Sequence, residues 1–381
     1  MCIFFFFDIV LFFLALNYNE RNKRLFYWIS ALILLFLLGM HNGTGDPRGY
    51  GYDYPHYLNF FRGIMDMYGS VDSPETYELN WPYFYFCKFL RFFGKADFIY
   101  IVAYCLFVNI PFLIFVKKYS KNASLSILWL FILQSTELHL FVNSVHRQMI
   151  AHSFFMIAMF LFLKYQTKDN QWYKEKSKIL LLLLLLGIAI LGHSSSYFVI
   201  VLLVGICKSP VFRKKTQLTI IGMSMILGVF FSKFFLGYFS NFMFLLKDVD
   251  EVSNSTRYLV NDIYETQDAN LFFLLPQTLM TLAVIYYSNN DELKSIFVKS
   301  LFWATFIFNI FFSVPLISRS LTTLWVIAIS GCIPIAFRNN SRGKIVMIVI
   351  VLLQLYIAYR HYELPSFRML PFKFIWEASS Q

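Results

Sequence analysis

Long apolar runs recur along the chain and are separated by short segments rich in lysine and arginine. The runs extend to about 15 to 20 residues, a length at which a helix rising about 1.5 Å per residue crosses the hydrocarbon layer of a bilayer. The pattern therefore predicts about twelve transmembrane helices. Their predicted ranges are 1–16, 25–40, 97–116, 123–142, 148–163, 179–192, 196–207, 217–238, 271–287, 297–315, 321–337 and 344–358.

The composition assigns the chain to the polytopic, all-α integral membrane proteins. Of its 381 residues, 58% are hydrophobic, 14% are charged and 46 are phenylalanine. The net charge of +11 would suit nucleic acid, but the basic residues lie in short loops between apolar runs, as the positive-inside bias requires. We therefore expect no nucleic-acid partner and a single transmembrane domain over 1–381.

The basic loops predict which side of the membrane each connection faces. The loops 19–24, 117–121, 164–178, 208–215 and 337–344 can all be cytoplasmic only if the stretch 78–93 does not cross. We predict a re-entrant or surface-lying helix there, with Lys88 and Arg91 on its polar edge. Residues 41–96 then form one outer loop with juxtamembrane helices, and 239–270 form a second.

Polar and charged residues whose side chains are able to bind a substrate or transfer a proton gather at the predicted outer positions. They are Arg48, Asp53, Glu78, His146, Arg147, Gln148, His193, Ser194, Arg257 and Arg319. Each also has a structural interpretation: an arginine at a helix end can extend to lipid headgroups, His193 can be a structural histidine, and Asp53 can cap a helix that starts at Tyr54. As a set they predict chemistry at the outer face, because outer arginines beyond the positive-inside pattern call for an anion.

Several stretches in order along the chain resemble the EpsG family of Wzy-like exopolysaccharide and O-antigen polymerases. They are RGYGYDYPHY, YELNWPYFYFCKFLRFFG, VHRQMIAHSFFMIAMFLF, GHSSS and an arginine before SLTTLWVIAIS. The resemblance extends over most of the chain. It implies a GT-C-like fold in the bacterial cytoplasmic (inner) membrane, with many spans and an active site on the outer face.

The resemblance also implies a reaction and its partners. A glycan is transferred from undecaprenyl diphosphate to the hydroxyl of another lipid-linked repeat unit, so the lipid-linked oligosaccharide is both donor and acceptor. Chain-length regulators or other assembly proteins are further partners that such a polymerase can have.

The candidate residues fit this reaction chemically. Guanidinium groups bind a diphosphate through two parallel hydrogen bonds and stabilise its growing charge, and a carboxylate or imidazole accepts the proton of the attacking hydroxyl. The predicted base is Asp53, Glu78 or His193. The predicted substrate-binding residues are Arg48, Arg147, Gln148, Arg257, Arg319, Tyr54, Tyr57 and Trp81, whose aromatic members offer flat faces to sugar rings.

No cofactor or metal is predicted. Asp46 and Asp53 have a spacing that suits a cation, but the arginines can take over the role of the metal. The cysteines form no CxxC pair, which argues against zinc and against a disulfide framework; they are Cys2, Cys87, Cys105, Cys207 and Cys332.

Two other functions remain open at this level. A flippase or transporter of lipid-linked oligosaccharide would place ionisable groups inside its spans, where the sequence has Asp8 and Glu137. A membrane glycosyltransferase that adds a single sugar from a lipid phosphate donor would have a similar sequence pattern.

Overall fold

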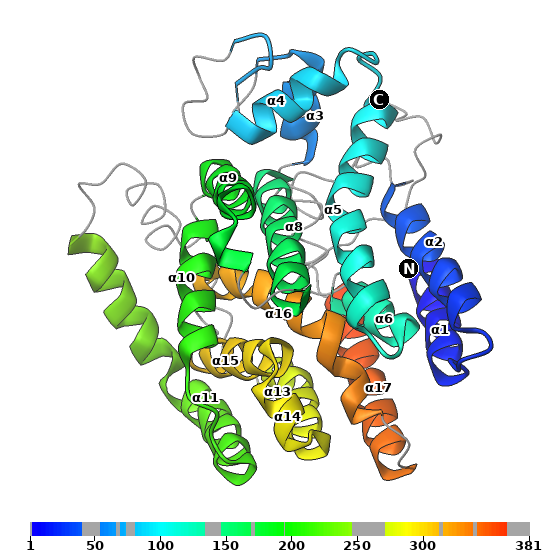
Figure 1. The fold of residues 1–381 in the computed structure, drawn as a ribbon, viewed down its shortest axis with the longest axis vertical. Helices are drawn as coiled ribbons and strands as arrows, with labels where there is room; N and C mark the ends of the chain where they lie inside the picture. Colours follow the sequence, from blue (N-terminus) through cyan, green and yellow to red (C-terminus); the bar gives the residue numbers. More distant parts are fainter. Residues whose placement is uncertain are drawn as a thin grey trace. The chain divides into compact units, whose positions relative to one another are not determined.

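A computed structural model describes residues 2–39, 54–65, 69–73, 81–133, 146–168, 172–193, 195–245, 271–311, 315–337 and 341–363. These residues are helical or lie in turns and connections, with one isolated β-bridge between Ser70 and Ser73 (Figure 1). The helices are α1 (Cys2–Leu16), α2 (Lys23–Gly39), α3 (Tyr54–Arg62), α4 (Trp81–Leu90), α5 (Asp97–Tyr119), α6 (Ala123–Leu133), α8 (His146–Lys168), η3 (Trp172–Lys174), α9 (Lys176–Gly192), α10 (Ser195–Lys208), α11 (Lys214–Leu245), α13 (Leu271–Tyr287), α14 (Asn290–Lys294), α15 (Ile296–Phe311), α16 (Pro315–Ala336) and α17 (Ser341–Glu363).

Each of the predicted spans overlaps one of these helices, and the all-α prediction is confirmed. By length and composition, two segments of the described chain are suited to cross a membrane, Asp97–Tyr119 in α5 and His146–Thr167 in α8. Five further apolar helices are shorter. The count of about twelve crossings stays a prediction.

The chain divides into two compact units, the first made of Met1–Val201 with Ala358–Gln381 and the second of Leu202–Ile357. In the first unit, the basic ends of α2, α5, α8 and α9 meet at one end. Cation–π contacts at this basic end include Lys117 over Trp28 (5.1 Å), Lys118 over Phe160 (5.3 Å) and Lys178 over Tyr165 (5.2 Å).

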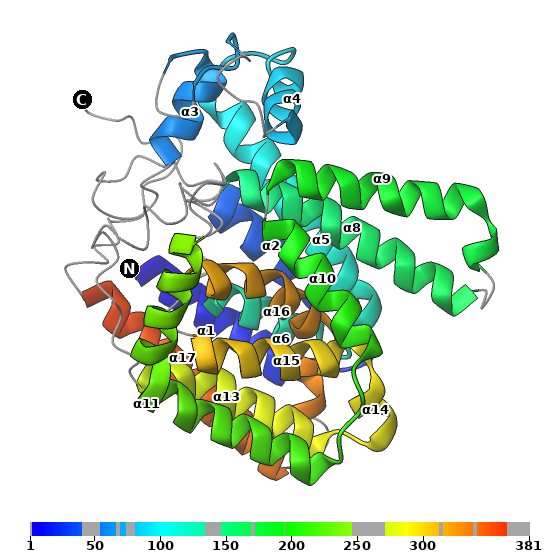
Figure 2. The ribbon, with the colours of Figure 1, turned by 90° about the vertical axis from the view of Figure 1, so that its left-hand side faces the viewer.

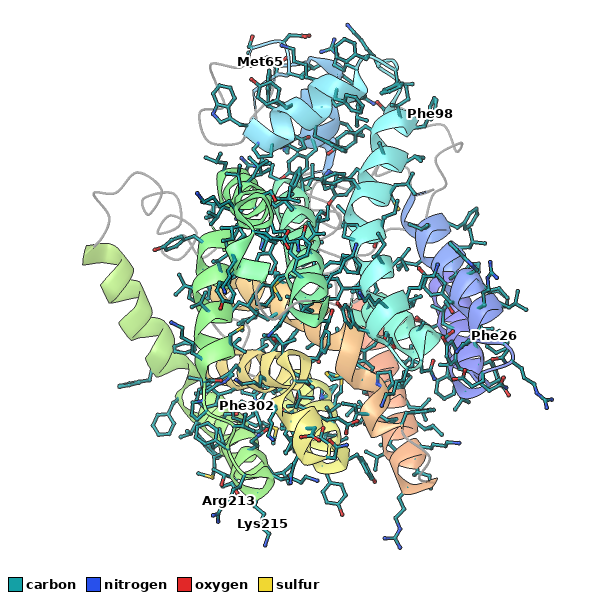
Figure 3. All side chains as sticks on the ribbon, in the orientation of Figure 1. Phe26, Met65, Phe98, Arg213, Lys215 and Phe302 are labelled. Atoms are coloured by element: carbon teal, nitrogen blue, oxygen red, sulfur yellow. The ribbon has the colours of Figure 1, made fainter. Side chains whose placement is uncertain are left out.

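The short helices α3 and α4 lie at the opposite end of the first unit, beside the start of α5 (Figures 1 and 2). Met65 and Phe98 project outward there (Figure 3). α4 has 10 residues and so extends for about 15 Å, half the thickness of the hydrocarbon layer. The absence of a crossing at 78–93 stays a prediction.

Ion pairs and a glycine turn hold α3 and α4 in place. Gly63 ends α3 with a φ of 84°, a left-handed conformation that glycine adopts without strain. Arg62 donates two hydrogen bonds to the Asp97 carboxylate at the start of α5, and Arg91 after α4 pairs with Asp72 at 2.8 Å. These pairs link the end of each short helix to a neighbouring segment of the same unit.

In the second unit, hydroxyl and amide side chains join α11, α13 and α15. Asn309 donates to the Ser224 hydroxyl (3.0 Å) and accepts from Thr278 (3.1 Å), while Thr281 and Thr305 share a hydrogen bond of 2.8 Å. We call these five residues the Asn309 ladder. Phe302 of α15 is buried in this unit, whereas Arg213 and Lys215 project at the start of α11 (Figure 3).

Candidate functional site

His146 is the first residue of α8 and is fully buried. The ring of Tyr57 from α3 stacks on its imidazole with centroids 4.4 Å apart, and the ring of Tyr104 from α5 stacks on it at 4.0 Å. Two rings at these distances on one face would overlap each other, so they lie on opposite faces. The imidazole is therefore held between a helix of the first outer loop and a predicted span.

A chain of hydrogen bonds fixes the imidazole in its own plane. The Tyr100 hydroxyl lies 2.6 Å from His146 Nδ1, the hydroxyls of Tyr83 and Tyr100 are 3.2 Å apart, and Tyr83 donates to the main-chain oxygen of Tyr57 (3.4 Å). Either hydroxyl can donate in the Tyr83–Tyr100 pair, and the tautomer of His146 decides which atom donates between Tyr100 and Nδ1. Burial raises the pKa of the Tyr83 phenol, which therefore stays neutral. We call Tyr57, Tyr83, Tyr100, Tyr104 and His146 the Tyr–His cluster.

Arg147 and Gln148 follow directly in the first turn of α8, which begins two residues earlier than predicted. The Arg147 side chain is half-buried with its Nε buried, and Gln148 is buried. The first turn of a helix presents main-chain N–H groups and the positive end of the helix dipole. A guanidinium beside that helix end is suited to bind an anion.

The end of α9 reaches the same part of the first unit. A Cβ atom on Gly192 would lie 2.9 Å from the Ala151 Cβ, and 3.6 Å from Pro82 at the start of α4. His193 follows at the C-cap of α9, half-buried, with its main-chain N–H bonded to Ala189. The end of α9 that carries His193 therefore lies against α8, one turn after Arg147 and Gln148. It also lies near Pro82, the residue after Trp81.

The two predicted sugar-stacking aromatics with described side chains differ in their surroundings. Tyr57 is 1% exposed, and its ring packs on His146 and Tyr83, so the structure gives it a role inside the protein. Trp81 is 50% exposed and stacks on Tyr85, which is 54% exposed. Trp81 therefore keeps an accessible aromatic surface.

Several predicted site residues have no described side-chain position. Arg48, Asp53, Glu78 and Arg257 lie outside the described residues, as do Ser194 and Glu137. For Tyr54 and Arg319 only the backbone is described. Tyr54 starts α3, where the capping interpretation of Asp53 predicts a helix start, and Arg319 lies within α16 rather than in the turn before a helix starting at 321. The roles assigned to these residues stay predictions.

The described residues contain no group of three or more His, Cys, Asp or Glu side chains placed to hold a metal ion. Cys87, Cys105 and Cys332 are buried thiols, and Cys207 is an exposed one. Asp8 is buried in α1. Within the described part of the chain, the Tyr–His cluster with Arg147, Gln148 and His193 is thus the arrangement that best fits a site.

Comparison with known proteins supports the resemblance seen in the motifs. A sequence model described as EpsG family matches residues 24–374, nearly the whole chain. No curated protein and no solved structure matches the chain. The match includes α3, α4 and the start of α8, where the motif residues lie. The chain belongs to the EpsG family, and is a membrane protein of polysaccharide biosynthesis.

Proposed function

We propose that the protein is a polysaccharide polymerase that works at the outer face of the bacterial cytoplasmic membrane. It transfers a glycan from undecaprenyl diphosphate to a hydroxyl of another lipid-linked repeat unit. The observation that carries the proposal is the segregation in the first unit. Arg147, Gln148 and His193 lie at the end with α3 and α4, and the lysines of the predicted cytoplasmic loops beside α5 and α9, Lys117, Lys118 and Lys178, lie at the other.

The leaving group is the lipid diphosphate, whose negative charge grows as the bond from the sugar C1 to the phosphate oxygen breaks. Arg147 lies at a helix start near a predicted membrane surface, where such a group is found. Its planar guanidinium makes two parallel contacts that a lysine ammonium cannot reproduce. We assign diphosphate binding to Arg147, with Arg319 and Arg257 as further ligands.

The attacking sugar hydroxyl must lose its proton as it bonds to C1. Asp53 is our first choice of base, followed by Glu78 and His193. Asp53 directly precedes α3, whose Tyr57 contacts His146, the residue before Arg147. Trp81 offers an accessible ring to a sugar.

Transport of lipid-linked oligosaccharide is the second candidate. One observation favours it: Asp8 is buried in α1, and its Oδ1 has no hydrogen-bond partner among the described residues. Ionisable groups inside a span often belong to transport pathways. The described α5 and α8, by contrast, each run for 23 residues as one helix, with Pro111 inside α5, and neither is divided into the two half-helices typical of transporter sites.

Deleting the gene separates the two functions. A polymerase defect leaves single repeat units on the lipid carrier at the outer face, and ligation products that carry one unit. A transport defect traps the units at the cytoplasmic face. Accumulation of cytoplasmic-facing units would reject polymerisation, and Asp8→Asn would then be the first variant to examine.

A further inference from the structure

The proposed reaction does not use His146. Among the histidines of the outer motifs whose side chains the structure describes, His146 is the most completely buried. Its surroundings come from three other helices: Tyr57 from α3, Tyr83 of α4 through the hydrogen-bond chain, and Tyr100 and Tyr104 from α5. It is also the residue directly before Arg147.

These contacts leave the imidazole little freedom. Stacking on both faces fixes the plane of the ring, and the 2.6 Å hydrogen bond at Nδ1 fixes its rotation within that plane. A residue held in this way at the first position of a helix also fixes the backbone of the next residue. The first turn of α8 is thus anchored to α3 and α5 through a side chain.

We infer that His146 is a positioning residue that sets Arg147 relative to the start of α3. This inference rests on the proposed function. The stacked Tyr57 lies one helical turn after Asp53 in sequence, so one imidazole links the segment of the proposed base with the proposed diphosphate ligand. A shift of about 1 Å between such groups lowers a rate by up to about a hundredfold.

Simple core packing would not need this polar arrangement. An apolar side chain of similar volume can fill a space between aromatic rings, and a buried hydrogen-bonded network costs desolvation that packing avoids. The hydrogen-bond network instead fixes the orientation of the His146 ring. The inference therefore predicts that orientation, rather than volume, is the property of residue 146 that activity requires.

The first test compares His146→Asn with His146→Leu. The Asn amide can donate to or accept from the Tyr100 hydroxyl in place of Nδ1, whereas Leu better replaces the volume. Purified protein in nanodiscs is given the lipid-linked repeat unit extracted from the deletion strain. We expect kcat to stay within about threefold of wild type for His146→Asn and to fall about tenfold or more for His146→Leu. The reverse order would overturn the inference.

The second test separates positioning from stability. Tyr100→Phe removes one partner of the hydrogen bond and should lower both Tm and kcat, whereas Tyr197→Phe, on an exposed tyrosine of α10, should lower neither. In the double variant Tyr100→Phe with His146→Leu both partners are apolar, so Tm should recover. We expect kcat to remain about tenfold low. Recovery of kcat together with Tm would show a purely structural role and overturn the inference.

These outcomes are distinct from a failure of the proposed function. If wild-type protein does not lengthen the extracted repeat units, polymerisation itself is wrong. If the wild type lengthens them and the His146 and Tyr100 variants do so equally well, only the positioning inference is wrong.

Discussion

Two buried polar clusters in the protein, the Tyr–His cluster of the first unit and the Asn309 ladder of the second, are built from different groups. The ladder consists of neutral hydroxyls and one amide between predicted spans. The Tyr–His cluster consists of aromatic rings and an imidazole, and it directly precedes an arginine. Both satisfy buried polar atoms, but only the second contains groups that can direct a charged side chain.

The difference indicates that the Asn309 ladder serves the stability of the fold and the Tyr–His cluster serves the chemistry. Neutral hydroxyl and amide contacts hold apolar helices together and need small residues that let the backbones approach. Gly228, beside the ladder, is such a residue, because its Cα faces the main chain of Asn309. Changes in the ladder should therefore affect the amount of folded protein, and changes around the Tyr–His cluster should affect polymer length.

The largest effect on chemistry is expected from Asp53→Asn. Asn caps a helix about as well as Asp but is not a base, so the change removes proton acceptance and keeps capping. We expect a stable protein whose polymerisation rate falls by about a hundredfold or more, leaving single repeat units. The measurement is the length distribution of the polymer on gels. Long polymer from Asp53→Asn and none from Glu78→Gln would transfer the base to Glu78, and activity of both variants would direct the search to His193.

Gly228→Ala should be the most damaging change beside the Asn309 ladder. The new Cβ would lie 1.8 Å from the Asn309 main-chain oxygen, so α11 and α15 would have to move apart. Such overpacking costs roughly 1 to 3 kcal/mol or more. The yield and Tm of detergent-solubilised protein report the loss. Gly222→Ala in the same helix is the matched control, because nothing lies within 4 Å of its Cβ.

Gly192→Ala should produce a smaller shift at the site itself. Its Cβ would approach the Ala151 Cβ at 2.9 Å, so the end of α9 must yield by several tenths of an ångström and carry His193 with it. We expect a loss of roughly 1 kcal/mol in stability together with shorter polymer. Gly187→Ala in α9, where nothing lies within 4 Å of the Cβ, should change neither. Equal effects of the two variants would show that the contact between Gly192 and α8 does not position His193.

The smallest expected effect is that of Thr305→Val. It removes the 2.8 Å hydrogen bond to Thr281 and leaves the shape almost unchanged. Side-chain hydrogen bonds between membrane helices contribute about 0.6 kcal/mol on average. We therefore expect a small decrease in Tm and polymer of normal length. A clear loss of polymer length at normal protein level would contradict the structural role of the ladder.

The sequence was a good guide to the helices because their apolar runs are long and the basic loops between them are distinct. It was less good at helix ends: α16 begins at Pro315, six residues before its predicted start, because polar residues such as Ser318 and Ser320 do not resemble a span. The short α4 was predicted from charge balance rather than from hydropathy alone.

The candidate site was only partly predictable. Arg147, Gln148 and His193 are conspicuous in the sequence because they stand at predicted outer positions, where an arginine beyond the positive-inside pattern calls for an anion. The role of His146 depends on Tyr57, Tyr100 and Tyr104, which are distant in sequence and which any aromatic-rich chain contains. Tyr57 was assigned to sugar stacking from its neighbours, and its burial against His146 could be found only from the packing.

The central claim is that Arg147 binds the diphosphate of the lipid carrier. Arg147→Lys keeps the charge but removes the two-pronged contact, and Arg213→Lys, on an exposed arginine, is the matched control. The decisive measurement is polymer length in the deletion strain carrying each variant at equal membrane levels. The account predicts mostly single repeat units for Arg147→Lys and wild-type polymer for Arg213→Lys, and wild-type polymer from Arg147→Lys would contradict it.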